Sequence, residues 1–451
     1  MKKKIINIVS FSVIFAILAG FGLYSFFDKD EAISEMENRT LAQKPSLSLS
    51  SYFSGDFSTD FEEYYNDQFP LRNTLVKLSN KIEALYSCFK VGDGATIIQG
   101  QGGVGEGEAL SRPAEEDTTE PDSTPNNDKT TEAQTNVDTT VPETKKPQNA
   151  VDVDEDSKET VYSAQYVILL GNRAMEMYTN SYKKIDGYVD TLNKLKKNMP
   201  DTKVYCMLAP TSIEFYAPKK YNDGKSKSQY QGIKYAYSKL NGITPIDAYS
   251  EIAPHTDEYL YFRTDHHWTA RGAYYAYRAF SKTANFEPVD IKSLETGTLK
   301  PFLGSLYRAT QSTVLEKDPD YLEYFVPKTN TTAIAANDAA MNKSYKIKVI
   351  NTNITSKNKY LSFVEGDHPV VKITTDAPNK RSILVIKESY ANAFVPWLCN
   401  NYSEVYVIDP RKLSVNIAGF VKANSIQEVL FLNYMFIPTN KTYMEALSSM
   451  G

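Results

Sequence analysis

The sequence predicts an α/β fold in which a mostly parallel sheet carries helices on both faces. One observation is a set of short, continuous apolar runs, the clearest of which are 382–386, 405–409 and 429–432. Such runs are typical of strands that are buried on both faces of a sheet. The second observation is the amphipathic stretch between successive runs, because crossover helices join parallel strands. The same order of strand, helix and strand occurs earlier in the chain, at 166–170, 184–198 and 204–209.

Polar residues follow the three late runs and mark the expected binding edge of the sheet. Ligands of doubly covered sheets bind at the carboxyl ends of the strands. The residues there are Lys387, Glu388 and Ser389 after the first run, Asp409, Pro410 and Arg411 after the second, and Asn433 and Tyr434 after the third. The stretch 292–375 is polar and irregular, and we interpret it as loops, with an inserted element of small strands as the alternative.

The first thirty residues predict a membrane anchor. Three lysines precede an uncharged stretch of 23 residues, 5–27, which is long enough to cross a bilayer as a helix. Asp28, Asp30 and Glu31 follow it, so the positive-inside rule puts the remaining chain outside the cytoplasm. A cleavable signal peptide is the alternative, but its apolar core has about 7 to 15 residues and ends at small residues. We therefore predict a single-pass protein of the cell membrane.

An acidic segment interrupts the chain. Residues 113–160 contain 14 acidic and 4 basic residues and no aromatic residue, Leu or Ile, so they cannot bury enough apolar surface to fold. The net charge of the whole chain is −5, and this segment accounts for it. We expect four segments: an anchor at 1–28, a helical layer at 29–99, a disordered linker at 100–160 and the main α/β domain at 161–451.

The composition excludes several classes of protein. The chain has four histidines, three cysteines and no Cys-x-x-Cys pattern, so we expect no cysteine and histidine metal site and no cofactor. An odd number of cysteines in a large exported chain also means that disulfides are not its framework. No basic stripe follows the first lysines, and we therefore expect no nucleic-acid partner.

The densest cluster of reactive side chains is 263–269, which holds two of the four histidines. It follows a strand-like segment at 259–262 and precedes a helical pattern. Residues two apart on an extended segment point to the same side, so Asp265 can reach His267, whereas His266 faces away. A carboxylate that holds an imidazole can make that imidazole the base for a serine nucleophile. The alternative is that Asp265 only caps the helix.

The second part of the expected site is Ser389, in a tight turn between the run 382–386 and a helix start. A hydroxyl there lies over the free amides of the helix, which can bind a developing oxyanion. The backbone amides of Ser389 and Tyr390 are the expected oxyanion donors, and the Asn433 side chain is a further candidate. Serine is also a preferred N-cap, so capping is the alternative, and only the pairing with His267 argues against it.

These residues resemble a known family. The tetrad Asp265-His266-His267-Trp268, the segments 37–39 and 67–72, and the turn 387–392 look like those of the DHHW family, which is related to the SGNH-like alginate O-acetyltransferases. The resemblance covers nearly the whole chain except the acidic linker. It implies a flavodoxin-like SGNH-hydrolase fold in which the serine segment comes late in the chain.

By motif match, the resemblance implies that Ser389 is the nucleophile, His267 the base and Asp265 the carboxylate that orients the base. It also implies an acetyl-serine intermediate, a sugar hydroxyl as acceptor, and a membrane-bound O-acyltransferase as the partner that supplies acetyl groups. The candidates for substrate contacts are His266, Trp268 and Arg411.

We therefore expect an extracytoplasmic O-acetyltransferase that acts on a cell-surface or exported polysaccharide. Two alternatives stay open. With water as the acceptor, the same residues give a carbohydrate esterase or deacetylase. The other alternative is a non-catalytic adaptor that binds a glycan or the acyltransferase. Glu388 favours the adaptor, because relatives usually carry Asp before this serine.

Overall fold

The computed structural model describes residues 42–69, 167–179, 181–218 and 228–451, with short pieces between 15 and 40, between 71 and 98, and at 160–162. Most of the predicted anchor, 5–27, and all of the predicted linker up to 159 lie outside the described residues. Within the part that is described, no helix has both the length and the apolarity needed to cross a membrane.

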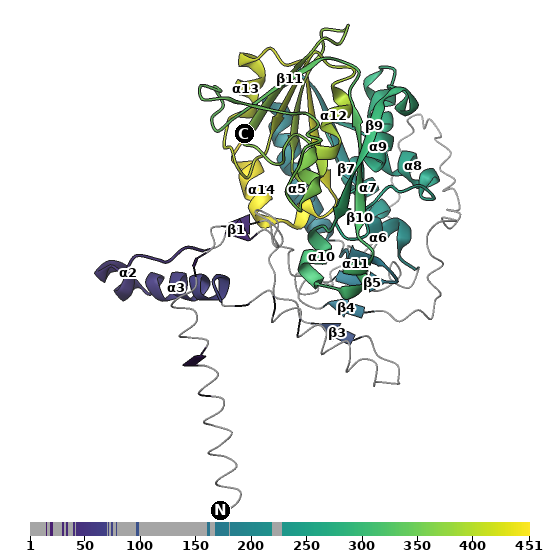
Figure 1. Cartoon of the computed structure of the whole chain (residues 1–451). Coiled ribbons are helices and arrows are strands. Elements are labelled where there is room, and N and C mark those ends of the chain that lie inside the picture. The colour runs from purple at the N-terminus through teal and green to yellow at the C-terminus, as the bar shows by residue number, and fades with distance from the viewer. Residues whose placement is uncertain are drawn as a thin grey trace, which may run out of the picture.

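An eight-stranded sheet forms the centre of the main body (Figure 1). In spatial order its strands are β12 (Tyr345–Ile347), β11 (Thr331–Ala336), β13 (Val370–Thr375), β15 (Glu404–Ile408), β14 (Ser382–Lys387), β16 (Glu428–Tyr434), β7 (Lys203–Ala209) and β8 (Thr244–Pro245). The strands from β15 to β8 pair in parallel, whereas β12, β11, β13 and β15 pair antiparallel. The sheet is therefore mixed, and the prediction of a mostly parallel sheet is wrong.

The parallel half of the sheet arises from the apolar runs in the sequence. All residues of β14 and β16 are buried, which explains why their sequences have no polar and apolar alternation. The predicted strands at 204–209, 382–386, 405–409 and 429–432 are all confirmed, to within two residues at their ends.

The antiparallel half comes from the stretch 292–375, which we interpreted mainly as loops. It contributes β11, β12 and β13 to the sheet, and β9 (Glu295–Phe302) and β10 (Asp320–Val326) as a separate antiparallel pair. Strands such as β9 and β12 are largely exposed. Exposed strands need no apolar run, because backbone hydrogen bonds hold them in place, and so their residues show only a weak strand pattern.

Helices cover both faces of the sheet, as predicted. Adjacent residues of a strand point to opposite faces, and Tyr205 and Cys206 of β7 show what lies on each. The ring of Tyr205 contacts Phe280 of α9 (Ala270–Ala284), with ring centroids 5.3 Å apart. On the other face, the Tyr188 hydroxyl of α5 (Tyr182–Lys197) lies 3.8 Å from the Cys206 sulfur.

The other helices of the main body are short. They are α6 (Ser212–Tyr216), α7 (Gln229–Ser238), α8 (Ala248–Ile252), α10 (Ser305–Thr310), α11 (Thr313–Lys317), α12 (Val395–Leu398), α13 (Ile417–Ala423) and α14 (Lys441–Ser448). Single 3-10 turns are η2 (Ala253–His255), η3 (Ile291–Ser293), η4 (Lys359–Ser362), η5 (Ser389–Ala393) and η6 (Ile437–Thr439).

A second, four-stranded sheet has the order β3 (Thr96–Ile98), β4 (Thr160–Tyr162), β5 (Val167–Leu170) and β6 (Arg173–Glu176). The predicted strand at 166–170 is thus a strand, but it is not a parallel strand of the main sheet. It turns back antiparallel through Gly171, whose φ is +57°, and Asn172. A two-residue turn with glycine is typical of a hairpin, and this signal was present in the sequence.

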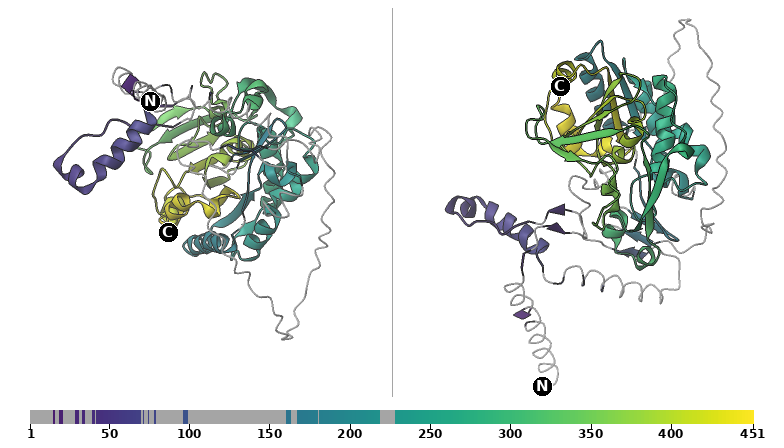
Figure 2. Two further views of the ribbon diagram at one scale, coloured as in Figure 1. Left: turned by 90° about the horizontal axis from the view of Figure 1, so that it is seen from below. Right: turned by 45° about the horizontal axis from the view of Figure 1, so that its top comes forward.

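Near the N-terminus, α2 (Leu49–Ser54) and α3 (Asp56–Asp67) form a helical pair. Both views of Figure 2 show the pair to one side of the main body. Two strands of two residues, β1 (Ile33–Ser34) and β2 (Arg39–Thr40), pair antiparallel before it. A helical layer was predicted for 29–99; within it α2 and α3 are helices, whereas β1, β2 and β3 are strands.

Candidate active site

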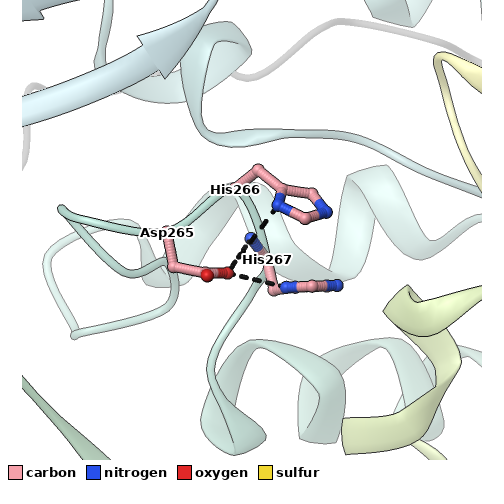
Figure 3. Close-up of side chains that lie close together, drawn as sticks. All are labelled: Asp265, His266 and His267. Atoms are coloured by element: carbon pink, nitrogen blue, oxygen red, sulfur yellow. Dashed lines mark hydrogen bonds and ion pairs between the residues drawn. The ribbon is translucent and has the colours of Figure 1, made fainter. Parts of the chain in front are cut away.

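A line of hydrogen bonds joins the three residues that the sequence singled out. His267 Nδ1 lies 2.6 Å from Asp265 Oδ1, and His267 Nε2 lies 2.9 Å from Ser389 Oγ. The backbone amide of His267 also donates to Asp265 Oδ1, at 2.9 Å. Figure 3 shows the Asp265 carboxylate on one side of the two histidine rings, facing the Nδ1 atom of each. Asp265 and His267 are buried, whereas Ser389 is only half-buried, so a substrate can approach the hydroxyl.

The loop that carries Asp265 is fixed at both ends. At its start, the buried Asp320 carboxylate accepts hydrogen bonds from the amides of Arg263 and Thr264, at 2.9 and 2.7 Å. At its end, Thr269 caps α9, and its hydroxyl accepts from the Gly272 amide at 3.1 Å. Thr269 therefore does the capping, and the alternative interpretation of Asp265 as the cap is wrong.

The turn at Ser389 is held by its neighbour. Glu388 is fully buried and is the N-cap of η5, because its carboxylate accepts from the Tyr390 amide at 2.8 Å. The second oxygen accepts from the amide of Tyr434, the last residue of β16, at 3.0 Å. Glu388 thus joins the serine turn to the end of the neighbouring strand. Since it is the cap, Ser389 is not, and its hydroxyl is directed at His267.

The Asp265 carboxylate is held in its charged form. Burial by itself raises the pKa of Asp265, but the attraction of His267 and the hydrogen bond to it hold this pKa well below its usual range. The second oxygen, Oδ2, accepts from the Ser305 amide at 2.7 Å. Gly304 lies directly against the carboxylate, because a Cβ at this position would be 2.1 Å from Asp265 Cβ.

The charge of Asp265 sets the tautomer of His267. An ionised carboxylate only accepts hydrogen bonds, so His267 Nδ1 must carry the proton. In the neutral imidazole, Nε2 is then the acceptor, and it faces the Ser389 hydroxyl. This is the arrangement in which a histidine can remove the proton of a serine.

His266 does not face away, contrary to expectation. Its ring lies beside that of His267, with centroids 3.8 Å apart, and its Nδ1 is 2.6 Å from Ser305 Oγ. The Ser305 amide also binds Asp265, so Ser305 connects His266 with Asp265. It does so on the side of these residues that is opposite Ser389. The two-residue alternation failed here because the segment is a loop and not a regular strand.

A tyrosine from a distant part of the chain completes the site. The ring of Tyr360, in η4, is stacked on the ring of His267 at a centroid distance of 3.9 Å. Its hydroxyl donates to the carbonyl of Ser389 at 3.1 Å. Tyr360 therefore contacts both the base and the backbone of the nucleophile.

The expected substrate and oxyanion residues have other partners. Trp268 is fully buried and donates to the Tyr390 carbonyl at 2.8 Å, so it is a core residue. The Tyr390 amide already donates to Glu388. The Asn433 amide group accepts from Tyr188 at 3.0 Å and donates to the Tyr443 hydroxyl at 2.7 Å.

Arg411 also lies inside the protein and not on an open rim. Its side chain is 5% exposed and binds Asp409 and Asp367, at 2.6 and 3.0 Å. Asp367 in turn binds Lys387, whose Nζ lies 2.5 Å from it and 2.7 Å from Asn392 Oδ1. These residues form a buried ionic cluster around the base of the serine turn, where they hold the turn in place.

Asp265, His266 and His267 are also the described residues whose ligand atoms lie close enough to hold a metal ion, within 4.8 Å of one another. The Nδ1 atoms of both histidines are engaged, by Asp265 and by Ser305. The 2.6 Å contact between His267 and Asp265 is a direct hydrogen bond. In this arrangement the cluster matches a carboxylate and imidazole pair better than a metal site.

Four contributors were missed in the sequence: Gly304, Ser305, Tyr360 and Asp367. Ser305 is 40 residues from Asp265, and no pattern at 300–310 connects it to the tetrad. The only local signal was the pair Gly304-Ser305 before a short helix, which resembles many helix starts. Gly304 and Ser305 lie between β9 and β10, and Tyr360 and Asp367 lie between β12 and β13, so these contacts depend on the tertiary fold.

Comparison with solved structures supports the fold. A DHHW family protein from Eubacterium siraeum DSM 15702 is 28% identical, with a TM-score of 0.57 over 62% of this chain and 94% of its own. Bacillus cereus PatB1 with a sulfonyl adduct is 18% identical, with a TM-score of 0.51 over 61% of this chain and 97% of its own. The comparison with curated proteins found no match.

The family is shown by the sequence itself. The family model described as DHHW protein matches residues 37–408, which is most of the chain. This span includes the tetrad at 265–268 and the serine turn at 387–392, on which the resemblance was based. The chain belongs to the DHHW family.

Proposed function

We propose that this protein is an extracytoplasmic O-acetyltransferase that acts on a cell-surface or exported polysaccharide through an acetyl-serine intermediate. The observation that carries the proposal is the hydrogen-bonded line from Asp265 through His267 to the half-buried Ser389. A serine hydroxyl is a weak nucleophile until a base removes its proton, and this line supplies that base.

The first half of the reaction forms the intermediate. Ser389 Oγ bonds to the carbonyl carbon of the acetyl donor while its proton moves to His267 Nε2. The bond from that carbon to the leaving group then breaks, and the leaving group takes the proton from His267. Asp265 stabilises the imidazolium in between.

The second half transfers the acetyl group. A sugar hydroxyl gives its proton to His267 and bonds to the acetyl carbon. The bond to Ser389 Oγ breaks, and His267 returns the proton to this oxygen. The enzyme is restored, and the product is an acetyl ester of the sugar. Water in place of the sugar gives acetate, which is the esterase reaction.

The donor and the location are part of the proposal. An acetyl group outside the cytoplasm has to be passed across the membrane, and a membrane-bound O-acyltransferase is the partner that does so. The predicted anchor at 5–27 would hold the site near that partner.

The test is acetylation of the surface glycan in cells that carry single variants. Ser389→Ala and His267→Ala should abolish acetylation. Asp265→Asn should reduce it severely, and His266→Ala should reduce it less. Ser238→Ala, an exposed serine of α7, is the matched control and should keep full acetylation. Normal acetylation with Ser389→Ala would exclude the enzyme and leave the adaptor.

A second experiment separates the transferase from the esterase. The purified domain is mixed with 4-nitrophenyl acetate, and intact mass spectrometry follows an acetyl group on Ser389. Adding an oligosaccharide should then yield acetylated sugar faster than acetate. Release of acetate alone, with every acceptor tried, would show an esterase.

A further inference from the structure

Arg308, an arginine next to the site, forms no ion pair by contact with any described residue, although the charge of Asp265 acts on it. Arg308 lies in α10, three residues after Ser305, so both side chains are on the same face of the helix. Ser305 binds His266 at 2.6 Å, the His266 ring lies on that of His267, and His267 binds Ser389. The face of α10 that carries Arg308 is thus directed at the reactive residues.

Arg308 differs from the other arginines of the main body. Among the described residues from 167 onward, each other arginine has a partner: Arg263, Arg271, Arg278, Arg381 and Arg411 bind carboxylates, and Arg173 binds backbone carbonyls. The Arg308 guanidinium has neither an ion pair nor a hydrogen bond within this described part.

The Arg308 residue is half-buried, and its guanidinium reaches solvent only in part. None of its nitrogen atoms is among the described buried atoms that lack a hydrogen-bond partner. Because these nitrogen atoms also lack partners, they must reach solvent. Burial lowers the pKa of Arg308, and the charge of Asp265 offsets this only in part. Arginine nevertheless stays protonated in proteins, so a positive charge is kept here without a contacting anion.

We propose that Arg308 is a binding site for an anionic group, a carboxylate or a phosphate, on the acceptor glycan. The inference rests on the proposed acetyl transfer and names the acceptor as an acidic polysaccharide. The planar guanidinium binds carboxylates and phosphates through two parallel hydrogen bonds, which also fixes the orientation of the ligand. An acceptor held there would lie beside the part of α10 that binds His266 and Asp265.

A purely structural role makes a different prediction. If Arg308 only stabilised the charge of Asp265, its loss would change the pH dependence of acetyl transfer and leave ligand preference unaltered. Asp265 does not form an ion pair with Arg308 by contact, because its two oxygens bind His267 and the Ser305 amide. Measuring ligand binding in the absence of acetyl transfer therefore distinguishes an anion-binding role of Arg308 from a role in stabilising the charge of Asp265.

The experiment is calorimetric titration of the full-length protein with three oligomers of equal length: galacturonate, glycerol phosphate and the neutral xylose oligomer. At least one anionic oligomer should bind about tenfold or more tightly than xylose, the range expected for hydrogen bonds to a charged group. Arg308→Gln should remove this preference, and Arg308→Lys should keep part of it. Lys317→Gln, at an exposed lysine of α11, removes an equal charge nearby and should change nothing.

The outcomes are distinguishable from those of the proposed function. Preference for galacturonate identifies a carboxylate, and preference for glycerol phosphate identifies a phosphate. Equal affinity for all three oligomers, or an unchanged preference in Arg308→Gln, would overturn the inference. The acetyl adduct on Ser389 is measured separately by mass, so a protein that binds anions but never becomes acetylated refutes only the enzyme.

Discussion

The ring of Tyr360 is parallel to the ring of His267, at an interplanar angle of 13° and a centroid distance of 3.9 Å. The imidazole is therefore fixed by Asp265 at one edge and by an aromatic face above the ring plane. Because rotation of the His267 side chain is restricted in this way, Nε2 stays directed at the Ser389 hydroxyl. This geometry makes Tyr360 a positioning residue of the site.

Replacing Tyr360 should reduce the rate of acetyl transfer. Tyr360→Leu removes the stacked face, and we expect kcat to fall about 10- to 100-fold, because small losses of alignment cost that much. Tyr360→Phe keeps the face and loses only the hydrogen bond to the Ser389 carbonyl, so its effect should be smaller. The rate is measured by 4-nitrophenol release. Equal losses in the two variants would show that the hydroxyl matters and the stacking does not.

Gly304→Ala should damage the site through Asp265. A Cβ at this position would lie 2.3 Å from Asp265 Oδ2, so the carboxylate has to move away from His267. We expect activity to fall nearly as far as in Asp265→Asn, together with a lower melting temperature. Gly187→Ala is the matched control, since an added Cβ in α5 meets nothing within 4 Å. In a helix interior this change should stabilise the protein by about 0.5 to 1 kcal/mol.

Gly304→Ala should lower the stability and Gly187→Ala should raise it only if Asp265 is packed tightly against Gly304. Should Gly304→Ala retain full activity and melt at the same temperature as the parent, α10 would be free to shift outward. The contact between the Ser305 amide and Asp265 would then be less important than its 2.7 Å distance indicates.

Glu388 should be needed for stability as well as for activity. Glu388→Ala leaves the amides of Tyr390 and Tyr434 buried without an acceptor, which costs about 3 kcal/mol of unfolding free energy. Glu388→Gln keeps one acceptor and should cost less. Urea unfolding measures both, and Glu295→Gln, at an exposed position of β9, is the control.

Glu388→Asp is informative because it keeps the charge and shortens the side chain by one methylene. The shorter side chain reaches the adjacent Tyr390 amide more easily than the Tyr434 amide across the strand. If Glu388→Asp is fully stable and active, the neighbouring strand is not bound through this carboxylate.

The sequence predicted the centre of the fold because that centre is buried on both faces. The runs that form β7, β14, β15 and β16 contain few polar residues. Such strands can be recognised from the apolar run alone, without a polar and apolar alternation. It did not predict β11 and β12, which lie towards the edge and gain their stability from backbone pairing. The mixed character of the sheet was therefore missed.

The site likewise has a part that the sequence predicted and a part that it did not. Asp265 and His267 are two residues apart, and Ser389 follows a strand end, so local rules suggested both parts. Whether a side chain is open to substrate depends on packing from elsewhere in the chain. Trp268 and Arg411 were candidates for substrate contacts, but Trp268 is fully buried and the Arg411 side chain is only 5% exposed.

Acid should unfold this protein through two carboxylates. Burial raises the pKa of Asp265, but His267 holds it well below the usual range. Burial likewise raises the pKa of Asp367, and the charges of Lys387 and Arg411 bring it well below that range. Between these values and the ordinary aspartate pKa of about 4, the unfolded chain binds more protons than the folded protein. The stabilisation from both groups is therefore complete above about pH 5 and is lost as the pH falls through 4 and below.

Asp367→Asn isolates one of these contributions. This variant should be less stable than the parent at pH 7, because Lys387 and Arg411 lose a charged partner, and its unfolding free energy should fall less steeply between about pH 5 and pH 3. Urea midpoints at each pH give the slope, and Asp201→Asn, at an exposed turn, should keep that of the parent. An identical slope for Asp367→Asn would mean that Asp367 takes up its proton at the same pH in the folded and unfolded chain. The Asp367 carboxylate would then add nothing to the acid sensitivity, and other carboxylates with a lowered pKa, such as Asp265, would have to account for it.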